Sequence, residues 1–317
     1  MKKIILSIVL IASGLAAFAQ QDPQYTMYMF NQMAVNPGYA GSRECISATA
    51  HYRTQWTGID GAPKTLSFGI HSPIGNERLA VGLQVVNDRL GVTNSTNVSG
   101  VVAYRLPVTK KSKLSIGLQA TVTNYLNNLA SVTSAAAAGS DPSFNTNSNL
   151  LLPNFGTGAY WYSDKGYLGL TVPHLINNHL EDKSTVAISS AAKQYRHLFL
   201  MAGWMFKLSD VVKFKPSVML KYAPNSPVET DLNGCFLLYD ALWLGVSWRS
   251  DVSTLRDHLT ESTDFMAIYE INQMMRIGLA YDLTVTKLSG YNYGTYELML
   301  GYDFRKKMDR MLTPRYF

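Results

Sequence analysis

The side chains best suited to metal binding or acid–base catalysis are six histidines, and they are scattered along the chain. None stands at the spacing of a metal-ligand motif, and the sequence contains no nucleophile elbow and no Ser-His-Asp order. We therefore expect a non-enzymatic protein without a cofactor or a metal ion, although polar groups distant in sequence can still meet in a fold. The histidines are His51, His71, His174, His179, His197 and His258.

Aromatic side chains suited to binding gather near the N-terminus. Residues 20–43 are too long for a turn, and leaving their aromatic and methionine side chains together in water would be costly. We expect this segment to fold into the lumen or against the periplasmic mouth and to block free diffusion as a plug; the alternative is a periplasmic arm that becomes ordered only on binding a partner. The candidate plug or partner contacts are Tyr25, Tyr28, Phe30, Asn36, Pro37 and Tyr39.

Trp56 is a second candidate contact. It lies in Gln55–Pro63, where turn-forming residues surround the aromatic ring, as in a shaped recognition loop. The alternative is that Trp56 only anchors the chain at a membrane interface. Residues 126–149, rich in Ala, Ser and Asn, are a further candidate contact for a surface partner.

The elements that must position these side chains are strands, because apolar residues recur at every second position. In 113–124, for example, Leu114 and Ile116 alternate with Ser115 and Gly117. Such a strand faces different media on its two sides. This pattern predicts about fourteen strands. They are expected near 44–53, 63–72, 77–87, 97–106, 113–124, 153–163, 166–173, 195–206, 211–222, 230–239, 241–249, 263–271, 274–284 and 295–304.

The connections between these strands alternate in length. The longer set is 54–62, 88–96, 125–152, 174–194, 223–229, 250–262 and 285–294, and the shorter set is 73–76, 107–112, 164–165, 207–210, 240 and 272–273. Long extracellular loops and short periplasmic turns are typical of outer-membrane barrels. We therefore predict an all-β protein, a transmembrane antiparallel β-barrel of the outer membrane with both chain ends in the periplasm; a soluble periplasmic β-sandwich is the alternative.

Aromatic residues near the strand ends fit the interfacial girdles of such a barrel. The protein has 19 Tyr, 12 Phe and 5 Trp residues. The residues expected in the girdles are Tyr104, Tyr160, Trp161, Tyr222, Trp243, Tyr281 and Tyr302.

Charged residues fall on neighbouring predicted strands. Lys215 and Lys221 share one parity, and Asp231 lies on the next strand, with Arg249 beyond it. A lysine or arginine on the lipid face would cost about 2–4 kcal/mol at the midplane, so these side chains are expected to face the lumen. Lys215, Lys221 and Asp231 are therefore candidate plug or partner contacts; a transport pathway is the alternative.

The two ends of the chain lie outside the predicted barrel. Met1–Ala19 has a short basic start, an apolar core and the small residues Ala17 and Ala19, and is read as a cleaved signal peptide. We divide the chain into 1–19 (signal peptide), 20–43 (plug or periplasmic arm), 44–304 (barrel) and 305–317 (periplasmic tail). Cys45 and Cys235 either form one bridge or remain two thiols.

Short sequence blocks carry a family resemblance. They are Gln21–Thr26, Tyr28–Asn31, Asn36–Gly41, Tyr52–Trp56, Gly61–Thr65, Val86–Asp88 with Gly91, Lys215–Ser217, Lys221–Pro224, Asp231–Asn233, Ala280–Leu283 and Tyr296–Leu300. Together these blocks closely resemble the PorP/SprF family of Bacteroidetes outer-membrane proteins, which is linked to type IX secretion and gliding.

The resemblance implies a barrel embedded in outer-membrane lipid that works with the type IX machinery. It would either dock a component of the secretion apparatus or anchor a secreted surface adhesin, with no nucleic-acid partner. The alternative function is a channel or a FadL-like transporter for small apolar solutes.

Overall fold

The protein folds into one long antiparallel β-sheet with short 3-10 turns. The computed structural model describes residues 24–75, 78–131, 147–180, 194–224, 226–251, 261–272 and 274–304. The expected signal peptide (1–19) and C-terminal tail (305–317) lie outside the described residues, as does most of the candidate loop 126–149. The strands are β1 Ile46–Thr54, β2 Lys64–Ile74, β3 Leu79–Leu90, β4 Thr93–Thr109, β5 Ser112–Asn127, β6 Ser148–Ser163, β7 Gly166–Val172, β8 Leu198–Trp204, β9 Phe206–Lys207, β10 Val212–Tyr222, β11 Glu229–Leu238, β12 Leu242–Asp251, β13 Ser262–Ile271, β14 Met275–Thr284 and β15 Thr295–Phe304.

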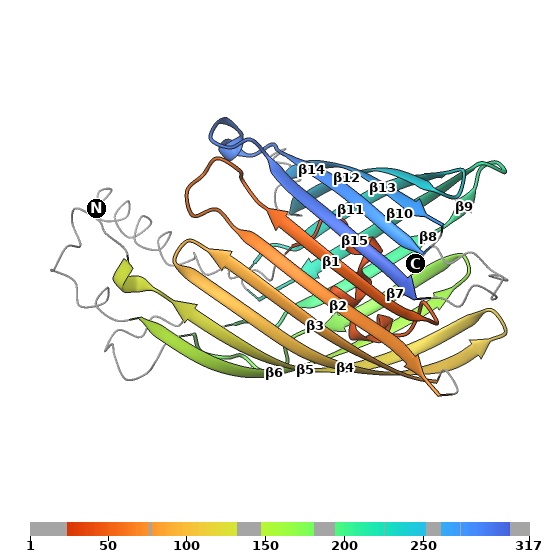
Figure 1. The fold of residues 1–317 in the computed structure, drawn as a ribbon, viewed down its shortest axis with the longest axis horizontal. Coiled ribbons are helices and arrows are strands. Elements are labelled where there is room, and N and C mark those ends of the chain that lie inside the picture. Colours follow the sequence, from red (N-terminus) through yellow and green to blue (C-terminus); the bar gives the residue numbers. More distant parts are fainter. Residues whose placement is uncertain are drawn as a thin grey trace, which may run out of the picture.

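The sheet closes on itself. Each strand pairs with its sequence neighbour, and the first pairs with the last, with Tyr52 on β1 opposite Leu298 on β15. The two-residue strand β9 continues β8 along the same partner, β10. The result is a closed barrel of 14 antiparallel strands, which confirms the predicted fold (Figure 1).

The strand residues form the barrel because their two faces meet different surroundings. On β2, Thr65 and Ser67 are buried inside, whereas Leu66 and Phe68 are exposed on the outside. A soluble protein would place the apolar set inside. Polar residues that face the lumen and apolar residues that face outward are typical of a barrel surrounded by lipid. This arrangement rules out the alternative of a soluble β-sandwich. No helix among the described residues is long and apolar enough to cross a membrane.

Two of the predicted girdle residues face inward instead. Tyr160 and Trp243 are buried in the lumen, where their rings pack edge-on against Tyr39 and Phe30, at centroid distances of 5.4 and 5.3 Å. The prediction from position along the strand was wrong because side-chain parity, not distance from the strand end, decides which face a residue occupies. Tyr104, Tyr222 and Tyr302 are exposed on the outer face, as expected.

The connections lie at two ends of the barrel. Short turns such as Lys110–Lys111 lie on the right in Figure 1, and long connections such as 285–294 lie on the left. By the usual asymmetry of outer-membrane barrels, the right-hand end is periplasmic and the left-hand end is extracellular.

One long connection was predicted wrongly. The expected loop 88–96 is a two-residue turn, Gly91–Val92, and Gly91 takes a left-handed φ of +57°. The polar run Asn94–Thr96 resembles a loop in sequence, but it extends β4 beyond the apolar stretch, where strands can be polar on both faces.

Residues 24–43, here called the inner segment, lie within the barrel. Three short 3-10 turns follow one another: η1 Tyr28–Phe30, η2 Gln32–Ala34 and η3 Pro37–Tyr39. The Asn36 side chain caps η3 by accepting a hydrogen bond from Gly38 N at 2.8 Å. Almost all of the inner segment is buried, and the red ribbon crosses the centre of the barrel in Figure 1. The remaining short turns are η4 Leu129–Ser131 and η7 Lys287–Gly290.

The inner segment runs from the extracellular half to the periplasmic end. Gln24 donates a hydrogen bond to Glu229, the first residue of β11, at 2.7 Å, beside the extracellular connection that precedes this strand. Arg43 lies at the other end, 3.0 Å from Asp303 near the end of β15. Gln24, the first described residue, thus lies toward the extracellular side. The two chain ends lie outside the described residues, so their expected periplasmic location stays a prediction.

This direction can be tested by labelling. In a background with Cys45→Ser and Cys235→Ala, we expect Gln24→Cys to react in intact cells with a membrane-impermeant maleimide. The control Lys110→Cys, on an exposed periplasmic turn, should react only after the outer membrane is permeabilised. Labelling of Gln24→Cys that also required permeabilisation would contradict the assigned direction.

Candidate functional site

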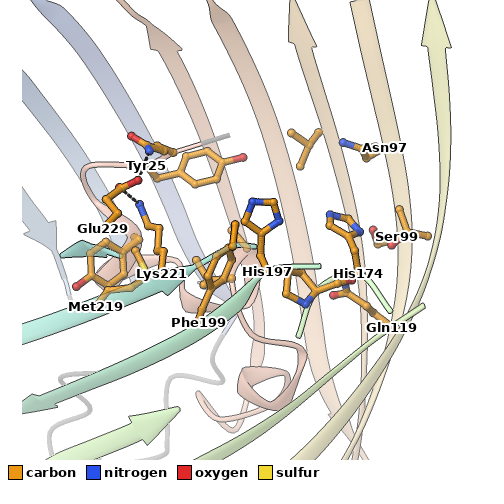
Figure 2. A pocket seen from close by; sticks show the side chains of 18 of the residues that line it. Tyr25, Asn97, Ser99, Gln119, His174, His197, Phe199, Met219, Lys221 and Glu229 are labelled. Carbon is orange, nitrogen blue, oxygen red and sulfur yellow. Dashed lines mark hydrogen bonds and ion pairs between the residues drawn. The ribbon is translucent and has the colours of Figure 1, made fainter. Parts of the chain in front are cut away.

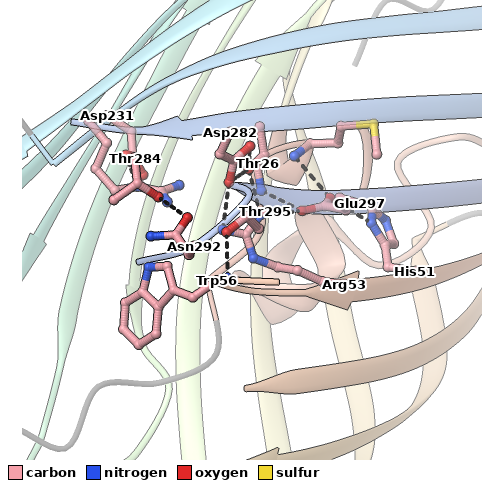
Figure 3. A network of polar contacts seen from close by, with 12 residues as sticks. Thr26, His51, Arg53, Trp56, Asp231, Asp282, Thr284, Asn292, Thr295 and Glu297 are labelled. Atoms are coloured by element: carbon pink, nitrogen blue, oxygen red, sulfur yellow. Dashed lines mark hydrogen bonds and ion pairs between the residues drawn. The ribbon is translucent and has the colours of Figure 1, made fainter. Parts of the chain in front are cut away.

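A buried carboxylate holds the start of the inner segment. Glu297, on β15, accepts hydrogen bonds from the backbone N–H groups of Thr26 and Met27, at 2.8 and 3.1 Å. Arg53, on the adjacent strand β1, donates to the same carboxylate at 3.0 Å (Figure 3). His51 Nδ1 lies 3.1 Å from Glu297 on the other side. One acidic side chain thus bonds both the barrel wall and the backbone of the inner segment.

A second carboxylate completes this anchor. Arg53 Nη2 lies 2.7 Å from Asp282 on β14, and its Nη1 donates to Thr26 Oγ1 at 2.7 Å. Thr26 in turn donates its hydroxyl hydrogen to Asp282 at 2.8 Å. Arg53, Asp282 and Glu297 are each nearly completely buried. Removing Arg53 from this set would leave two buried carboxylates without their shared cation, and such an uncompensated charge typically costs about 3–5 kcal/mol.

The predicted charged residues separate into two places. Lys221 lies 2.6 Å from Glu229 and 3.1 Å from Asp231, and Arg249 lies 2.6 Å from Asp231. Lys221 and Asp231 therefore meet in one ion-pair network, which also receives the hydrogen bond from Gln24.

Lys215 lies apart from that network. Its ammonium group lies over the rings of Phe30 and Trp243, 4.1 and 4.5 Å from their centroids. This cation–π arrangement fixes the aromatic side chain of η1 against β10 and β12. A hydrogen bond from Asn233 to the Tyr28 hydroxyl, at 2.9 Å, adds a polar contact on β11.

The half of the inner segment nearer the periplasm packs closely against β5 and β6. Asn36 donates to the carbonyl of Ala159 at 3.0 Å. A Cβ atom added at Gly117 would lie 2.3 Å from the backbone of Pro37 and Gly38, so only glycine allows this approach. Nearer the periplasm, Arg105 donates to the carbonyl of Gly41.

The candidate residues from the sequence thus occupy two regions. All of them except Trp56 lie in the lumen, where they join the inner segment to the wall. Contacts of any of these residues with another protein remain a prediction. The lumenal set is Tyr25, Tyr28, Phe30, Asn36, Pro37, Tyr39, Lys215, Lys221 and Asp231.

Trp56 belongs to a second region at the extracellular mouth. Its backbone has a φ of +44°, which a bulky residue adopts only when neighbours hold it, and its N–H donates to Thr295 Oγ1 at 3.2 Å. Backbone hydrogen bonds from Thr57 N to Gly294 O and from Tyr293 N to Thr57 O, at 2.9 and 2.8 Å, join this loop to the β14–β15 connection.

Two tyrosines in that connection were missed by sequence reasoning. Tyr291 and Tyr293 are 77% and 74% exposed, which is unusual for rings of this size in a held loop. The aromatic alternation Tyr291-Asn292-Tyr293 in a predicted extracellular connection was the available signal. We call Trp56, Tyr291 and Tyr293 the outer aromatic patch.

A cavity lies above the inner segment on the extracellular side. Its inner part, about 120 Å³, is bounded below by Tyr28 and Val35, and Figure 2 shows the side chains around it. A wider part of about 420 Å³ extends from it past Trp56 and shares His174 and His197 with it. We call the two parts together the outer chamber.

Few of the described side chains could bind a metal ion or take part in redox chemistry. In the described ranges no three His, Cys, Asp or Glu side chains are placed to hold a metal ion. Cys235 is buried, with its Sγ 3.8 Å from the Met266 sulfur, and is not bridged to Cys45.

Comparisons with known proteins agree with the barrel. A family model described as "Type IX secretion system membrane protein PorP/SprF" matches residues 17–302. No curated protein sequence matches the chain. A Pseudomonas aeruginosa FadL homologue has a TM-score of 0.50 at 14% identity, over 90% of this chain and 95% of that one. A mutant of the Rh. blastica porin has a TM-score of 0.37 at 8% identity, over 82% and 99%. At such identities the FadL likeness shows the fold alone.

Proposed function

Since the chain belongs to the PorP/SprF family of type IX secretion system membrane proteins, we propose that this outer-membrane barrel works as a sealed docking platform for another protein. The observation that carries this proposal is the anchored inner segment, which occupies the lumen. A barrel that carried solutes through its centre would have to release the contacts of Glu297, Asp282 and Asn36.

The inner segment acts as a plug in this proposal. Buried charges hold the end of the inner segment nearer the cell surface, and close backbone packing on Gly117 holds the half nearer the periplasm. The loss of any single contact by thermal fluctuation would therefore not release the segment from the lumen. Function then lies in what the barrel presents at its ends, not in what passes through it. This makes a non-enzymatic binding role the best-supported one.

The outer aromatic patch is the surface that would meet a partner. Tyrosine and tryptophan are the residues that most often dominate protein–protein binding energies. Here a positive-φ backbone and cross-loop hydrogen bonds fix Trp56, so little ordering is needed on binding. The partner is either a component of the secretion apparatus or a secreted adhesin retained at the cell surface.

Affinity purification tests this function. A tagged copy taken from native outer membranes in mild detergent should co-purify with one protein in near-equal amount by mass spectrometry, and Trp56→Ala and Tyr293→Ala should each reduce that amount at least about tenfold, as for a binding hot spot. Both variants should still assemble as heat-modifiable barrels.

The matched control is Tyr239→Ala. Tyr239 is also 77% exposed but lies in the periplasmic β11–β12 turn. Loss of capture in this variant alone would move docking to the periplasmic face. A barrel that purified alone, with lipid or a small apolar solute, would favour the transporter alternative.

A further inference from the structure

The outer chamber is a lined cavity that opens toward the extracellular mouth. Its inner part holds about 120 Å³ and its wider part about 420 Å³, whereas one water occupies roughly 30 Å³ in the liquid. The inner part alone therefore has room for about four waters, and the two parts together have room for a sugar ring. The wider part leads outward along the inner faces of β3–β5, so a ligand would enter from the cell surface and not from the periplasm.

One wall of the chamber is made of neutral hydrogen-bonding groups. Gln84 on β3, Ser99 on β4 and Thr121 on β5 face the inner part, and Ser99 and Thr121 lie 2.8 Å apart, joined by a hydrogen bond. Further out, Thr123 donates to Asn97 at 2.5 Å. Each hydroxyl keeps a free lone pair after these bonds, and an amide has several sites, so the wall can both donate to a ligand and accept from it.

The opposite wall is aromatic. The ring centroids of Phe199 and His197 lie 5.9 Å apart. Figure 2 shows Tyr25 of the inner segment above these two rings, with Ser99 on the other side of the chamber. Flat rings opposite amides and hydroxyls suit a ligand with C–H faces and a hydroxylated rim.

The charges in the chamber disfavour an anionic ligand such as a fatty acid. In the inner part, the Lys221 ammonium group lies 2.6 Å from the Glu229 carboxylate. Because the two charges neutralise each other, neither side chain attracts an anion or a cation. Two carboxyl groups, Asp88 and Glu261, line the wider part and disfavour an anion there. A fatty acid would therefore find Lys221 already paired with Glu229 and Asp231, and its alkyl chain would leave the amide wall unpaired, at about 1–3 kcal/mol per buried group.

Closure of the barrel excludes peptide recognition by strand addition. A bound peptide strand needs an unpaired sheet edge, and β1 and β15 pair with each other along their whole length. Recognition in the chamber must therefore come from side chains. Side-chain amides, hydroxyls and aromatic rings together are the groups that bind neutral sugars.

We propose that the outer chamber binds a sugar ring of a neutral, polyhydroxylated glycan that enters from the cell surface. The ring stacks against Phe199 and His197 and exchanges hydrogen bonds with Gln84 and Thr121. Trp56 lines the wider part of the chamber, but the inner part, with Gln84, Thr121 and Phe199, contains no residue of the outer aromatic patch. Substitutions at Gln84 and Thr121 therefore test glycan binding without changing the surface proposed for protein docking.

A glycan array tests the proposal. The full barrel, purified in detergent, is applied to neutral oligosaccharides built from glucose, galactose, mannose and N-acetylglucosamine, each presented free, peptide-linked and lipid-linked, with palmitate and glucuronate-containing oligosaccharides as charged comparisons. We expect binding to a neutral glycan. Preference among the three presentations identifies whether the source is a free sugar, a glycosylated protein or a surface glycolipid.

Isosteric variants locate the site. Gln84→Leu and Thr121→Val should each weaken the binding at least about tenfold, because each removes hydrogen bonds from a buried wall at little change in volume. The matched control is Thr171→Val, the same substitution at a buried position on β7 outside the chamber lining, and it should bind as the parent does. Binding of no neutral glycan, equal binding by all variants, or a preference for palmitate would each overturn the proposal.

Discussion

Glu297→Gln is expected to release the start of the inner segment from the barrel wall and to let the barrel conduct ions. The glutamine keeps the shape of the side chain but loses the charge that Arg53 and the backbone of Thr26 share. Arg53 would then be buried with Asp282 as its remaining carboxylate. We expect the free energy of unfolding, measured by denaturant titration in lipid vesicles, to fall by about 1.5–3 kcal/mol, the range typical of a hydrogen bond to a charged group. Planar-bilayer recordings should show conductance where the parent barrel shows little.

The matched control for this experiment is Asp210→Asn. Asp210 pairs with Lys207 at 2.6 Å on a periplasmic turn, and both side chains are exposed. The same change from carboxylate to amide there should alter neither stability nor conductance, because water screens an exposed pair. A Glu297→Gln barrel with the stability and conductance of the parent would show that this anchor does not hold the inner segment.

Gly117→Ala should unseat the lower end of the inner segment. The added Cβ would lie 2.3 Å from backbone atoms of Pro37 and Gly38, and backbone cannot rotate away as a side chain can. We expect a loss at the upper end of the roughly 1–3 kcal/mol typical of overpacking, together with conductance in planar bilayers. The barrel itself should still assemble, as shown by heat-modifiable migration on gels.

Gly100→Ala provides the comparison on the neighbouring strand β4. A Cβ atom at Gly100 meets no other atom within 4 Å, so the same substitution adds no contact with the inner segment. This variant should behave as the parent in both assays. Conductance in both variants would mean that the flexibility of the strands, and not the packing of Pro37 and Gly38 against Gly117, decides whether the lumen is blocked.

The barrel was predictable because lipid imposes a simple rule on each strand separately. Every second residue on the outer face must be apolar, so Leu66 and Phe68 alternate with Thr65 and Ser67 in a way that a reader of the sequence can see. Long and short connections then gave the orientation. The rule failed for 88–96 because a strand that extends past the lipid into water no longer needs an apolar face.

The sequence also singled out the residues of the inner segment, by their aromatic content, and the lumenal charges, by their parity. Their partners could not be deduced in this way. Arg53 meets Glu297 across 244 residues of sequence, and Asn36 meets the Ala159 carbonyl across 123, because closure of the ring decides which strands face one another.

What the sequence alone determined is therefore the barrel, its orientation and the set of polar side chains that must face inward. Only the tertiary structure decided that Gln24 lies toward the extracellular side, that Tyr160 and Trp243 pack in the lumen, and that Trp56 stands beside Tyr293. The physical reason is the distance along the chain over which each kind of interaction acts. Alternation reflects the local contact of each residue with lipid or lumen, whereas these placements depend on packing between segments that only the closed barrel brings together.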